Sequence, residues 1–253
     1  MTIHDATSPA CDVRCARIVE ILPDDAAYES AYSRLPAWRR RKCDAFRFMA
    51  DRRRSVAAWL LLRQMLTERG LDADLLTITE NEFGKPAFDS APGVHFSLSH
   101  AGDRVMAAVS DAEVGCDVER IVPIDDGMLK MALAEAERAS LAALSGAARD
   151  RAFIRLWVRK ESYVKAIGRG LDIDLSTFSA LDMPPSSDWT WHDFDFGDGH
   201  IGCVCTLDFR ASGESSCRPK KFLKIPPCAR WVGNGIICAR SPRKGGGSLT
   251  SEA

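Results

Sequence analysis

Helix signals and strand signals come in separate blocks along this chain, and their order limits the folds that it can adopt. Apolar residues at helical spacing dominate residues 27–69, with an interruption at Pro36. The segments expected after them are the strands 75–80, 94–100, 104–110 and 114–121, the helices 125–145 and 149–167, and the strands 177–182, 189–196 and 200–207. Blocks of this kind favour an α+β fold over a doubly wound parallel sheet.

Turn residues and irregular composition mark the ends of these segments. Gly84 and Pro86 predict a loop over residues 81–88. Gly168 is placed to end the long helix, because glycine adopts the left-handed conformation in which many helices terminate. Residues 1–15 are expected to form a loose start, and residues 211–253, rich in Ser, Gly, Pro, Lys and Cys, an irregular tail.

The composition is that of a globular protein. Apolar residues make up 46% and charged residues 27% of the 253, near the averages of globular domains, so we do not expect a disordered or fibrous chain. The sequence has no run of 18 apolar residues, and its start, M-T-I-H-D-A-T-S-P-A, lacks the basic and apolar regions of a secretion signal. We therefore expect a cytoplasmic protein that does not enter a membrane.

Charge and cysteine content argue against two further classes. The formal net charge of -1 argues against a protein that coats nucleic acid, although residues 38–54 are rich in arginine. Aromatic residues lie among those arginines, so the alternatives there are a nucleic-acid surface, a solvated helix face and a pocket for a few phosphates. The nine cysteines match no defensible zinc spacing, and without a secretion signal they favour reduced thiols over disulfides.

Two carboxylates two residues apart are the first candidate for chemistry. Asp117 and Glu119 lie on the strand predicted at 114–121, and residues two apart on a strand point to the same face. Oxygen ligands so placed suit Mg²⁺, which often takes one or two carboxylates and completes its shell with water and substrate phosphate. The alternative is a solvated face of an edge strand.

The segment W-V-R-K-E-S-Y-V-K, residues 157–165, is the second candidate. On a helix, Trp157, Glu161 and Lys165 share one face, with Lys160 beside them. One interpretation is a surface pair of Glu161 with Lys165, worth about 0.2 to 0.5 kcal/mol. The other makes Glu161 a third carboxylate at the metal and directs both lysines to phosphate oxygens.

A histidine at the end of a strand is the third candidate. His100 precedes a turn that contains glycine, where a side chain can reach a ligand, and the neighbouring Ser99 offers a hydroxyl and a backbone N–H. The alternative role for His100 is to cap the turn. Lys85, in G-K-P at 84–86, adds a cation on a loop.

In order along the chain, these motifs resemble those of one family. F-G-K-P, F-S-L-S-H-A-G, V-G-C-D-V-E-R and W-V-R-K-E-S-Y-V-K-A-I-G-R-G-L are similar to the successive motifs of the 4′-phosphopantetheinyl transferases, specifically the larger, surfactin-synthetase-activating type. The resemblance covers about residues 35–182. It implies two similar α+β halves related by a pseudo-twofold axis, which we place at 16–112 and 113–210.

The resemblance also implies a reaction. Members of this family move the 4′-phosphopantetheine arm of coenzyme A onto a serine of an apo acyl or peptidyl carrier protein and release 3′,5′-ADP. We therefore expect coenzyme A as co-substrate, Mg²⁺ (or Mn²⁺) as metal, a carrier protein as partner, no nucleic-acid partner and a monomer. The rival hypotheses are a metal-dependent phosphodiesterase or nuclease, and a catalytically idle protein that binds coenzyme A or a carrier.

Site residues carry over from the family position by position. The implied metal ligands are Asp117, Glu119 and Glu161, and Glu137 corresponds to a further acidic position near the metal. The implied catalytic residues are Glu161, Lys165, Asp117 and His100. The implied coenzyme A contacts are Arg39, Lys42, Arg54, Lys85, Pro86, Ser99, His100, Lys160 and Lys165, with Lys85 and Pro86 by the adenine and Lys160 and Lys165 facing the phosphates.

Overall fold

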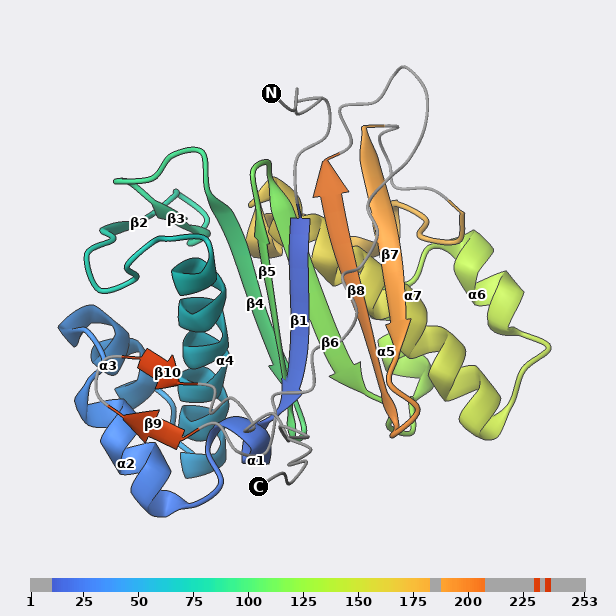
Figure 1. The fold of residues 1–253 in the computed structure, drawn as a ribbon. Helices are drawn as coiled ribbons and strands as arrows, with labels where there is room; N and C mark the ends of the chain where they lie inside the picture. The colour runs from blue at the N-terminus through green and yellow to red at the C-terminus, as the bar shows by residue number, and fades with distance from the viewer. Residues whose placement is uncertain (1–10, 183–187, 208–229, 233–234, 238–253) are drawn as a thin grey trace, which may run out of the picture. The chain divides into compact units, whose positions relative to one another are not determined.

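A computed structural model describes residues 11–182, 188–207, 230–232 and 235–237. Contacts group the chain into two compact units, residues 1–223 and residues 224–253. The larger unit mixes helices with antiparallel sheets, which confirms the predicted α+β class (Figure 1).

The first half of the larger unit begins with a strand and ends with a hairpin. Its elements are β1 (Cys11–Arg17), α1 (Ile18–Ile21), α2 (Asp25–Ser33), α3 (Ala37–Asp44), α4 (Met49–Glu68), β2 (Ile78–Glu80), β3 (Pro86–Phe88), β4 (His95–Ala101) and β5 (Arg104–Ser110). Asp24 caps α2 by accepting a hydrogen bond from the amide of Ala27, as its residue type predicts. Pro36 stands immediately before α3, where its fixed φ and missing N–H do no harm.

The second half repeats the pattern of strand, helices and hairpin. Its elements are β6 (Val114–Arg120), α5 (Asp126–Ala132), α6 (Glu135–Leu141), α7 (Gly146–Ile167), the short 3-10 turns Gly170–Asp172 and Leu175–Thr177, β7 (Trp189–Asp195) and β8 (His200–Leu207). The predicted helix at 149–167 is confirmed and begins three residues earlier. Gly168 ends it at φ 71°, the left-handed conformation expected of a terminating glycine.

Both halves arrange their strands in the same way. One three-stranded sheet has the order β1-β5-β4 and the other has the order β6-β8-β7. In each, the last strand of the half is central, the first strand lies on one side and the preceding strand on the other, and both pairings are antiparallel. A long helix packs on each sheet, α4 on β4 and β5, and α7 on β6 and β8 (Figure 1).

Serine side chains join the two sheets where β4 lies beside β6. The Ser97 hydroxyl accepts the amide of Cys116 at 3.0 Å, and the Ser99 hydroxyl accepts the amide of Val118 at 3.2 Å. These hydroxyls satisfy β6 amides at the seam between the two sheets. One result is that Ser99 lies against Asp117, although the two are 18 residues apart in sequence.

A glycine in β6 allows α7 to lie directly on the strand. A Cβ atom on Gly115 would stand 2.0 Å from the Ser162 carbonyl oxygen and 2.4 Å from the Ala166 amide nitrogen, both in α7. A side chain therefore cannot be accommodated at Gly115 without moving the helix. This close approach sets how far Glu161 and Lys165 of α7 lie from the carboxylates of β6.

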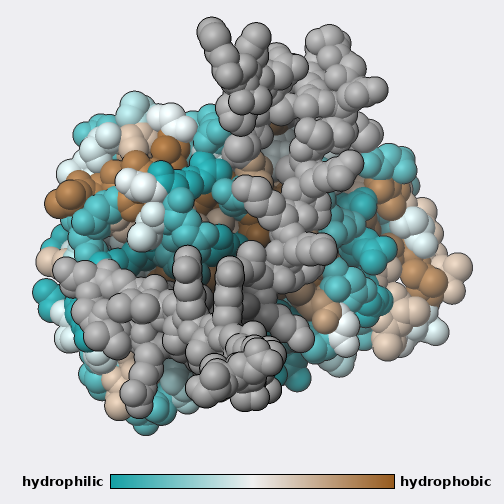
Figure 2. Space-filling view, viewed as in Figure 1, coloured by the Kyte–Doolittle hydropathy of each residue, from teal (hydrophilic) through white to brown (hydrophobic). Residues whose placement is uncertain are grey.

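Apolar side chains fill the space between each sheet and its helix. Met106, Cys116 and Val204 belong to a cluster at the junction of the two sheets, and Phe153 and Leu156 of α7 belong to a second cluster under α5 and α6. On the face drawn in Figure 2, hydrophilic residues surround separate hydrophobic patches. Among the residues that the structure describes, there is no helix with the length and apolar character needed to span a membrane.

Four expectations about elements were wrong in part. Residues 11–15, expected to be loose, belong to β1, which pairs along its whole length with β5. Residues 86–88, expected to be loop, form β3 and pair with β2. The helix expected over 125–145 is broken between α5 and α6, and no strand forms at 177–182, whose segment begins in a 3-10 turn. Local patterns missed these features because strand pairing and packing decide them.

The smaller unit is described only by two short strands. β9 (Arg230–Val232) pairs with β10 (Gly235–Ile237) in antiparallel register. Residues 211–253 were expected to be irregular, so these strands differ from that prediction. Their aromatic and β-branched residues favour extended backbone. The remaining residues of the segment lie outside the described part of the chain.

Candidate active site

A pocket of about 540 Å³ lies in the larger unit, a size typical of sites for small molecules and cofactors. Strands β4 and β6, helices α3, α4 and α7, and the loop before β3 all contribute to its wall. The lining residues include Trp38, Arg39, Lys42, Phe46, Ser55, Trp59, Phe83, Lys85, Pro86, Ser99, His100, Asp117, Glu119, Trp157, Glu161 and Lys165. Most of the predicted site residues thus share one cavity.

Three carboxylates line this pocket. Asp117 and Glu119 come from β6, and Glu161 comes from α7. Burial raises the pKa of Glu119 to about 7, and the charge on Asp117 adds to the increase. Burial and then the charge on Asp117 also raise the pKa of Glu161. Mutual repulsion of carboxylates in a partly buried site indicates a need for positive charge.

Lys165 supplies one such charge. Its ammonium donates to Asp117 Oδ1 at 2.6 Å and to the Ser99 hydroxyl at 3.3 Å. Ser99 in turn donates to Asp117 Oδ1 at 2.7 Å. Burial lowers the pKa of Lys165, but the Asp117 carboxylate outweighs burial, so the net pKa is raised. Lys165 is therefore a charged group inside the pocket, and its partner is Asp117 of β6.

The carboxylates have the chemistry for a hard divalent cation. Asp117 Oδ2 is buried and has no hydrogen-bond partner among the described residues, and Glu119 and Glu161 face the same pocket. Carboxylate oxygens are the ligands that Mg²⁺ prefers. Among the described residues, no group of three or more metal-ligating side chains is arranged to hold a metal ion. The carboxylates therefore match the ion in chemical type, and Lys165 is bound to Asp117 where a cation would compete.

A second region of the pocket is basic. The Arg39 guanidinium donates to the Ser55 carbonyl at 2.7 Å and to its hydroxyl at 2.8 Å. In the part of the chain that the structure describes, Arg39 Nε has no hydrogen-bond partner. Burial lowers the pKa of His100, and the cations Lys165, Arg54 and Arg39 lower it further. His100 is therefore a neutral imidazole at neutral pH, next to cations that favour an anion.

The loop before β3 contributes Lys85 and Pro86 to the pocket wall. The Lys85 ammonium forms an ion pair with Glu113 and donates to the Ala166 carbonyl at 2.6 Å. Lys42 also lines the pocket and lies 3.4 Å from Glu80. The structure thus places both predicted lysines at the cavity.

Arg54 is not brought to the pocket lining. Its guanidinium donates to the Gly102 carbonyl at 2.8 Å and to Asp51 Oδ1 at 2.5 Å. Arg54 does not line the pocket, and its contact with a ligand phosphate stays a prediction. The arginine is close enough to His100 to lower the pKa of the imidazole.

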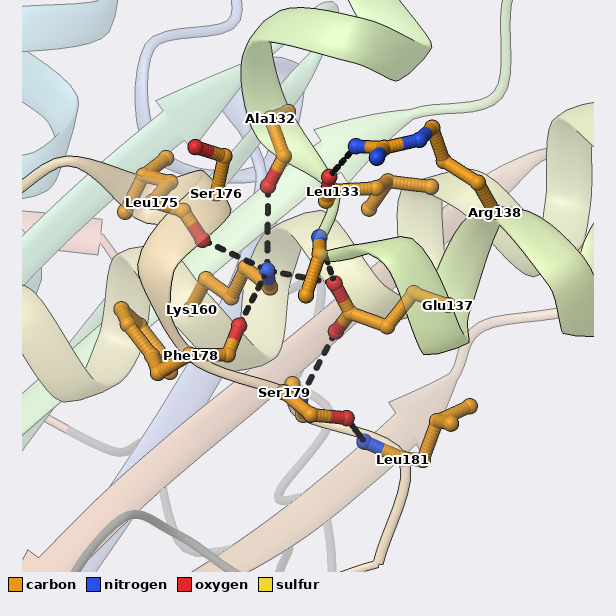
Figure 3. Close-up of polar contacts among 12 residues, drawn as sticks. Ala132, Leu133, Glu137, Arg138, Lys160, Leu175, Ser176, Phe178, Ser179 and Leu181 are labelled. Carbon is orange, nitrogen blue, oxygen red and sulfur yellow. Dashed lines mark hydrogen bonds and ion pairs between the residues drawn. The ribbon is translucent and has the colours of Figure 1, made fainter.

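Lys160 is also away from the pocket, and the expectation that it faces phosphates is wrong. Its ammonium is fully buried and surrounded by four oxygens (Figure 3). The carbonyls of Ala132, Leu175 and Phe178 accept at 3.0, 2.7 and 2.7 Å, and Glu137 Oε2 lies at 2.5 Å. Burial lowers the pKa of Lys160, and Glu137 opposes this effect.

Glu137 is the buried partner of Lys160 and does not line the pocket. Its carboxylate also accepts the amides of Ala134 and Ala180, each at 2.7 Å. Its suggested place near the metal is therefore corrected: the Lys160–Glu137 pair joins α7 to the start of α6 and to the segment that follows the second 3-10 turn.

Several lining residues were not predicted as site residues. Among them are Trp38, Phe46, Ser55, Trp59, Phe83 and Trp157. The signal available in the sequence was the mixture of aromatic and basic residues between 38 and 54, for which a phosphate pocket was one of three alternatives. Nothing in the local pattern indicated which of these side chains turn inward.

Comparisons with known proteins agree with the motifs. Residues 113–198 match the family model described as the 4′-phosphopantetheinyl transferase superfamily, and residues 21–112 match the model for the N-terminal part of these enzymes. The transferase AcpT of Salmonella typhi is 38% identical over 134 residues, which are 50% of this chain and 69% of the relative. The chain belongs to the 4′-phosphopantetheinyl transferase superfamily.

Two Bacillus relatives in this superfamily support the predicted Sfp-like type. The transferase psf-1 of Bacillus pumilus is 34% identical over 143 residues, or 56% of this chain. The transferase Sfp of Bacillus subtilis strain 168 is 31% identical over 142 residues, again 56% of this chain. The matched regions span 61% and 63% of the length of these two relatives.

The raised pKa of Glu119 leads to a prediction about pH. Its folded pKa of about 7 lies above the ordinary value for glutamate, so folding stability falls as pH rises from about 4.5 to about 7. In metal-free buffer, Glu119→Gln should therefore raise the free energy of unfolding at pH 8 by roughly 1 to 2 kcal/mol, after discounting for solvent screening, and change it little at pH 4.5.

Thermal unfolding at several pH values in the presence of EDTA measures this effect. Glu29→Gln is the matched control, because Glu29 is exposed on α2, away from the pocket. An equal change for Glu119→Gln at pH 4.5 and pH 8 would contradict the prediction.

Proposed function

We propose that this superfamily member transfers the 4′-phosphopantetheine arm of coenzyme A to a serine hydroxyl of an apo acyl or peptidyl carrier protein. The observation that carries the proposal is one pocket that combines Asp117, Glu119 and Glu161 with Lys165. Carboxylates for a metal and an ammonium for phosphate oxygens are the groups that displacement at a pyrophosphate requires. The names of the superfamily relatives support the same reaction.

The distribution of charge supports coenzyme A as the ligand. Arg39, Lys42 and His100 form the basic region, and guanidinium and ammonium groups suit a phosphate ester. Lys85 and Pro86 line the wall on the β3 side, where we place the adenine. Ser99 and Lys165 contact Asp117 and each other, and we place the pyrophosphate beside them.

Asp117, Glu119 and Glu161 would hold Mg²⁺, with Mn²⁺ as the alternative ion. A cation there neutralises charge on the pyrophosphate oxygens. Lys165, which is bound to Asp117, would offer its ammonium to the phosphate oxygens. Asp117, the most buried of the three, stays anchored through its hydrogen bond from Ser99.

The chain's own groups account for the steps of the transfer. The serine oxygen of the carrier forms a bond to the β-phosphorus, and the bond from that phosphorus to the bridging oxygen breaks, so that 3′,5′-ADP leaves. The proton of the serine hydroxyl passes to Glu161, because burial and the charge on Asp117 raise the pKa of this carboxyl and make it a stronger proton acceptor. Lys165 stabilises the charge that develops on the leaving oxygen.

A single assay tests the proposal. The protein is incubated with coenzyme A, Mg²⁺ and an apo carrier protein, and the carrier is then weighed by mass spectrometry. Transfer adds one phosphopantetheine arm to the carrier and yields 3′,5′-ADP. Hydrolysis of nucleotides or nucleic acid without modification of a carrier would instead identify a phosphodiesterase, and coenzyme A binding without turnover would identify an idle binding protein.

The proposed function also implies binding partners, an oligomeric state and a cellular location. We infer an apo carrier protein and coenzyme A as partners, with no role for nucleic acid or a membrane. A monomeric state and a cytoplasmic location are proposed with the same function. Size measurement in solution tests the first, and cell fractionation tests the second.

A further inference from the structure

Asn81 connects the loop before β3 to the end of α7, and it does not itself belong to the site described above. Its side-chain oxygen accepts the amides of Phe83 at 3.0 Å and Lys85 at 2.8 Å. Its side-chain nitrogen donates to the Gly168 carbonyl at 2.8 Å. The side-chain oxygen of Asn81 thus forms hydrogen bonds inside the loop. Its side-chain nitrogen forms one between the two halves.

The end of α7 needs such donors. The last carbonyls of a helix have no partner within the helix, and they carry partial negative charge. Asn81 supplies a donor to Gly168, and the Lys85 ammonium supplies one to Ala166 at 2.6 Å. Two side chains of the first half therefore cap the helix of the second half that carries Glu161 and Lys165.

The loop before β3 packs closely against the C-terminal end of α7. A Cβ atom on Gly168 would stand 2.7 Å from Lys85 Cδ and 3.1 Å from Asn81 Nδ2. The Arg169 guanidinium lies 5.9 Å from the centre of the Phe83 ring. Phe83, Lys85 and Gly168 line the pocket, whereas Asn81 does not. Asn81 therefore acts on the cavity through its neighbours.

We propose that Asn81 is a positioning residue that holds the wall formed by residues 83–86 against the C-terminal end of α7. It fixes the backbone of Lys85 in the loop and anchors that loop to Gly168. The distance between the β3 side of the pocket and Lys165 then depends on this amide together with the hydrogen bond from Lys85 to Ala166. The inference rests on the proposed function in so far as this wall contacts coenzyme A.

Two substitutions at Asn81 test the acceptor and the donor of the side-chain amide separately. Asn81→Ala removes all three hydrogen bonds. Asn81→Asp keeps an acceptor for the amides of Phe83 and Lys85 but loses the donor to Gly168 and places an acidic group beside a helix C-terminus. Asp72→Ala is the matched control, because Asp72 likewise accepts a main-chain amide, that of Asp74 at 3.0 Å, in a loop away from the pocket.

The measurements are the dissociation constant of coenzyme A by calorimetry, KM and kcat for transfer, and hydrogen exchange of residues 81–86 and 165–168. Both Asn81 variants should raise the dissociation constant and KM about fivefold, the effect of one net hydrogen bond, with kcat within about twofold of the wild type. Exchange should speed up in both segments, and Asp72→Ala should leave all these values unchanged.

Two results would overturn the inference. One is a dissociation constant and exchange rates in Asn81→Ala that match those of the wild type. The other is a fall in kcat that follows a lower melting temperature, since a merely structural residue would act in that way. If the wild type transfers nothing, the proposed function fails, while calorimetry and hydrogen exchange still decide the role of Asn81.

Discussion

The substitution Asp117→Asn is expected to reduce phosphopantetheine transfer by about a thousandfold, while the protein stays folded. Asp117 holds the Lys165 ammonium at 2.6 Å, accepts the Ser99 hydroxyl and belongs to the proposed metal ligands. Asn keeps the size and a hydrogen-bond acceptor but loses the negative charge. The lost charge also relieves repulsion on Glu119 and Glu161, so the cost in stability should be small.

A substitution of the same kind on the same sheet is the control. Asp193 of β7 pairs with Arg159 of α7 at 2.7 Å, as Asp117 pairs with Lys165, but it does not line the pocket. Asp193→Asn should keep transfer within about threefold of the wild type, since it removes only a partly exposed ion pair. Mass measurement of the carrier gives the rates, and thermal unfolding monitors the fold. Normal Mg²⁺-dependent turnover by Asp117→Asn would remove Asp117 from the mechanism.

The largest loss of stability is expected for Lys160→Met, at about 3 to 5 kcal/mol. The substitution leaves the buried Glu137 carboxylate without its cation and frees three carbonyls that now accept from Lys160. Leaving one charge of a buried pair unpartnered costs far more than losing a surface pair. Urea unfolding of the variant measures the difference, and transfer kinetics at low temperature report on the molecules that remain folded.

Two comparisons make this prediction specific. Lys160→Met combined with Glu137→Gln removes the unpaired charge, so the double variant should be more stable than Lys160→Met alone. Arg17→Met, which breaks the exposed pair of Arg17 with Asp103, should cost no more than about 1 kcal/mol. A Lys160→Met variant with normal stability and a KM for coenzyme A raised tenfold would contradict the structure and restore Lys160 as a phosphate contact.

The case of Lys160 shows where a local pattern stops being informative. Lys160, Glu161 and Lys165 lie within six residues on one helix, and the sequence suggested that all three serve the ligand. Successive helical residues differ in direction by about 100°, so Lys160 and Glu161 cannot share one environment. Packing of α5, α6 and the segment after Leu175 on α7 encloses Lys160, while Glu161 and Lys165 face the cavity.

The β6 carboxylates show the opposite case. Residues two apart on a strand share a face whatever surrounds them, so Asp117 and Glu119 were correctly placed together from their spacing. Their meeting with Glu161 depended on α7 lying against β6, which Gly115 permits. The type of each group was therefore visible in the sequence, and its distance from the next group was not.

The sequence by itself determined the α+β class, the main helices and strands, the superfamily and most of the pocket's charged residues, because periodicity and motif chemistry are local properties. Only the tertiary structure decided that β1 pairs with β5, that Lys160 and Glu137 are buried partners, that Arg54 stays outside the cavity and that Asn81 caps α7. These facts join residues far apart in the chain, and such contacts arise from packing and from satisfying buried polar groups across the fold.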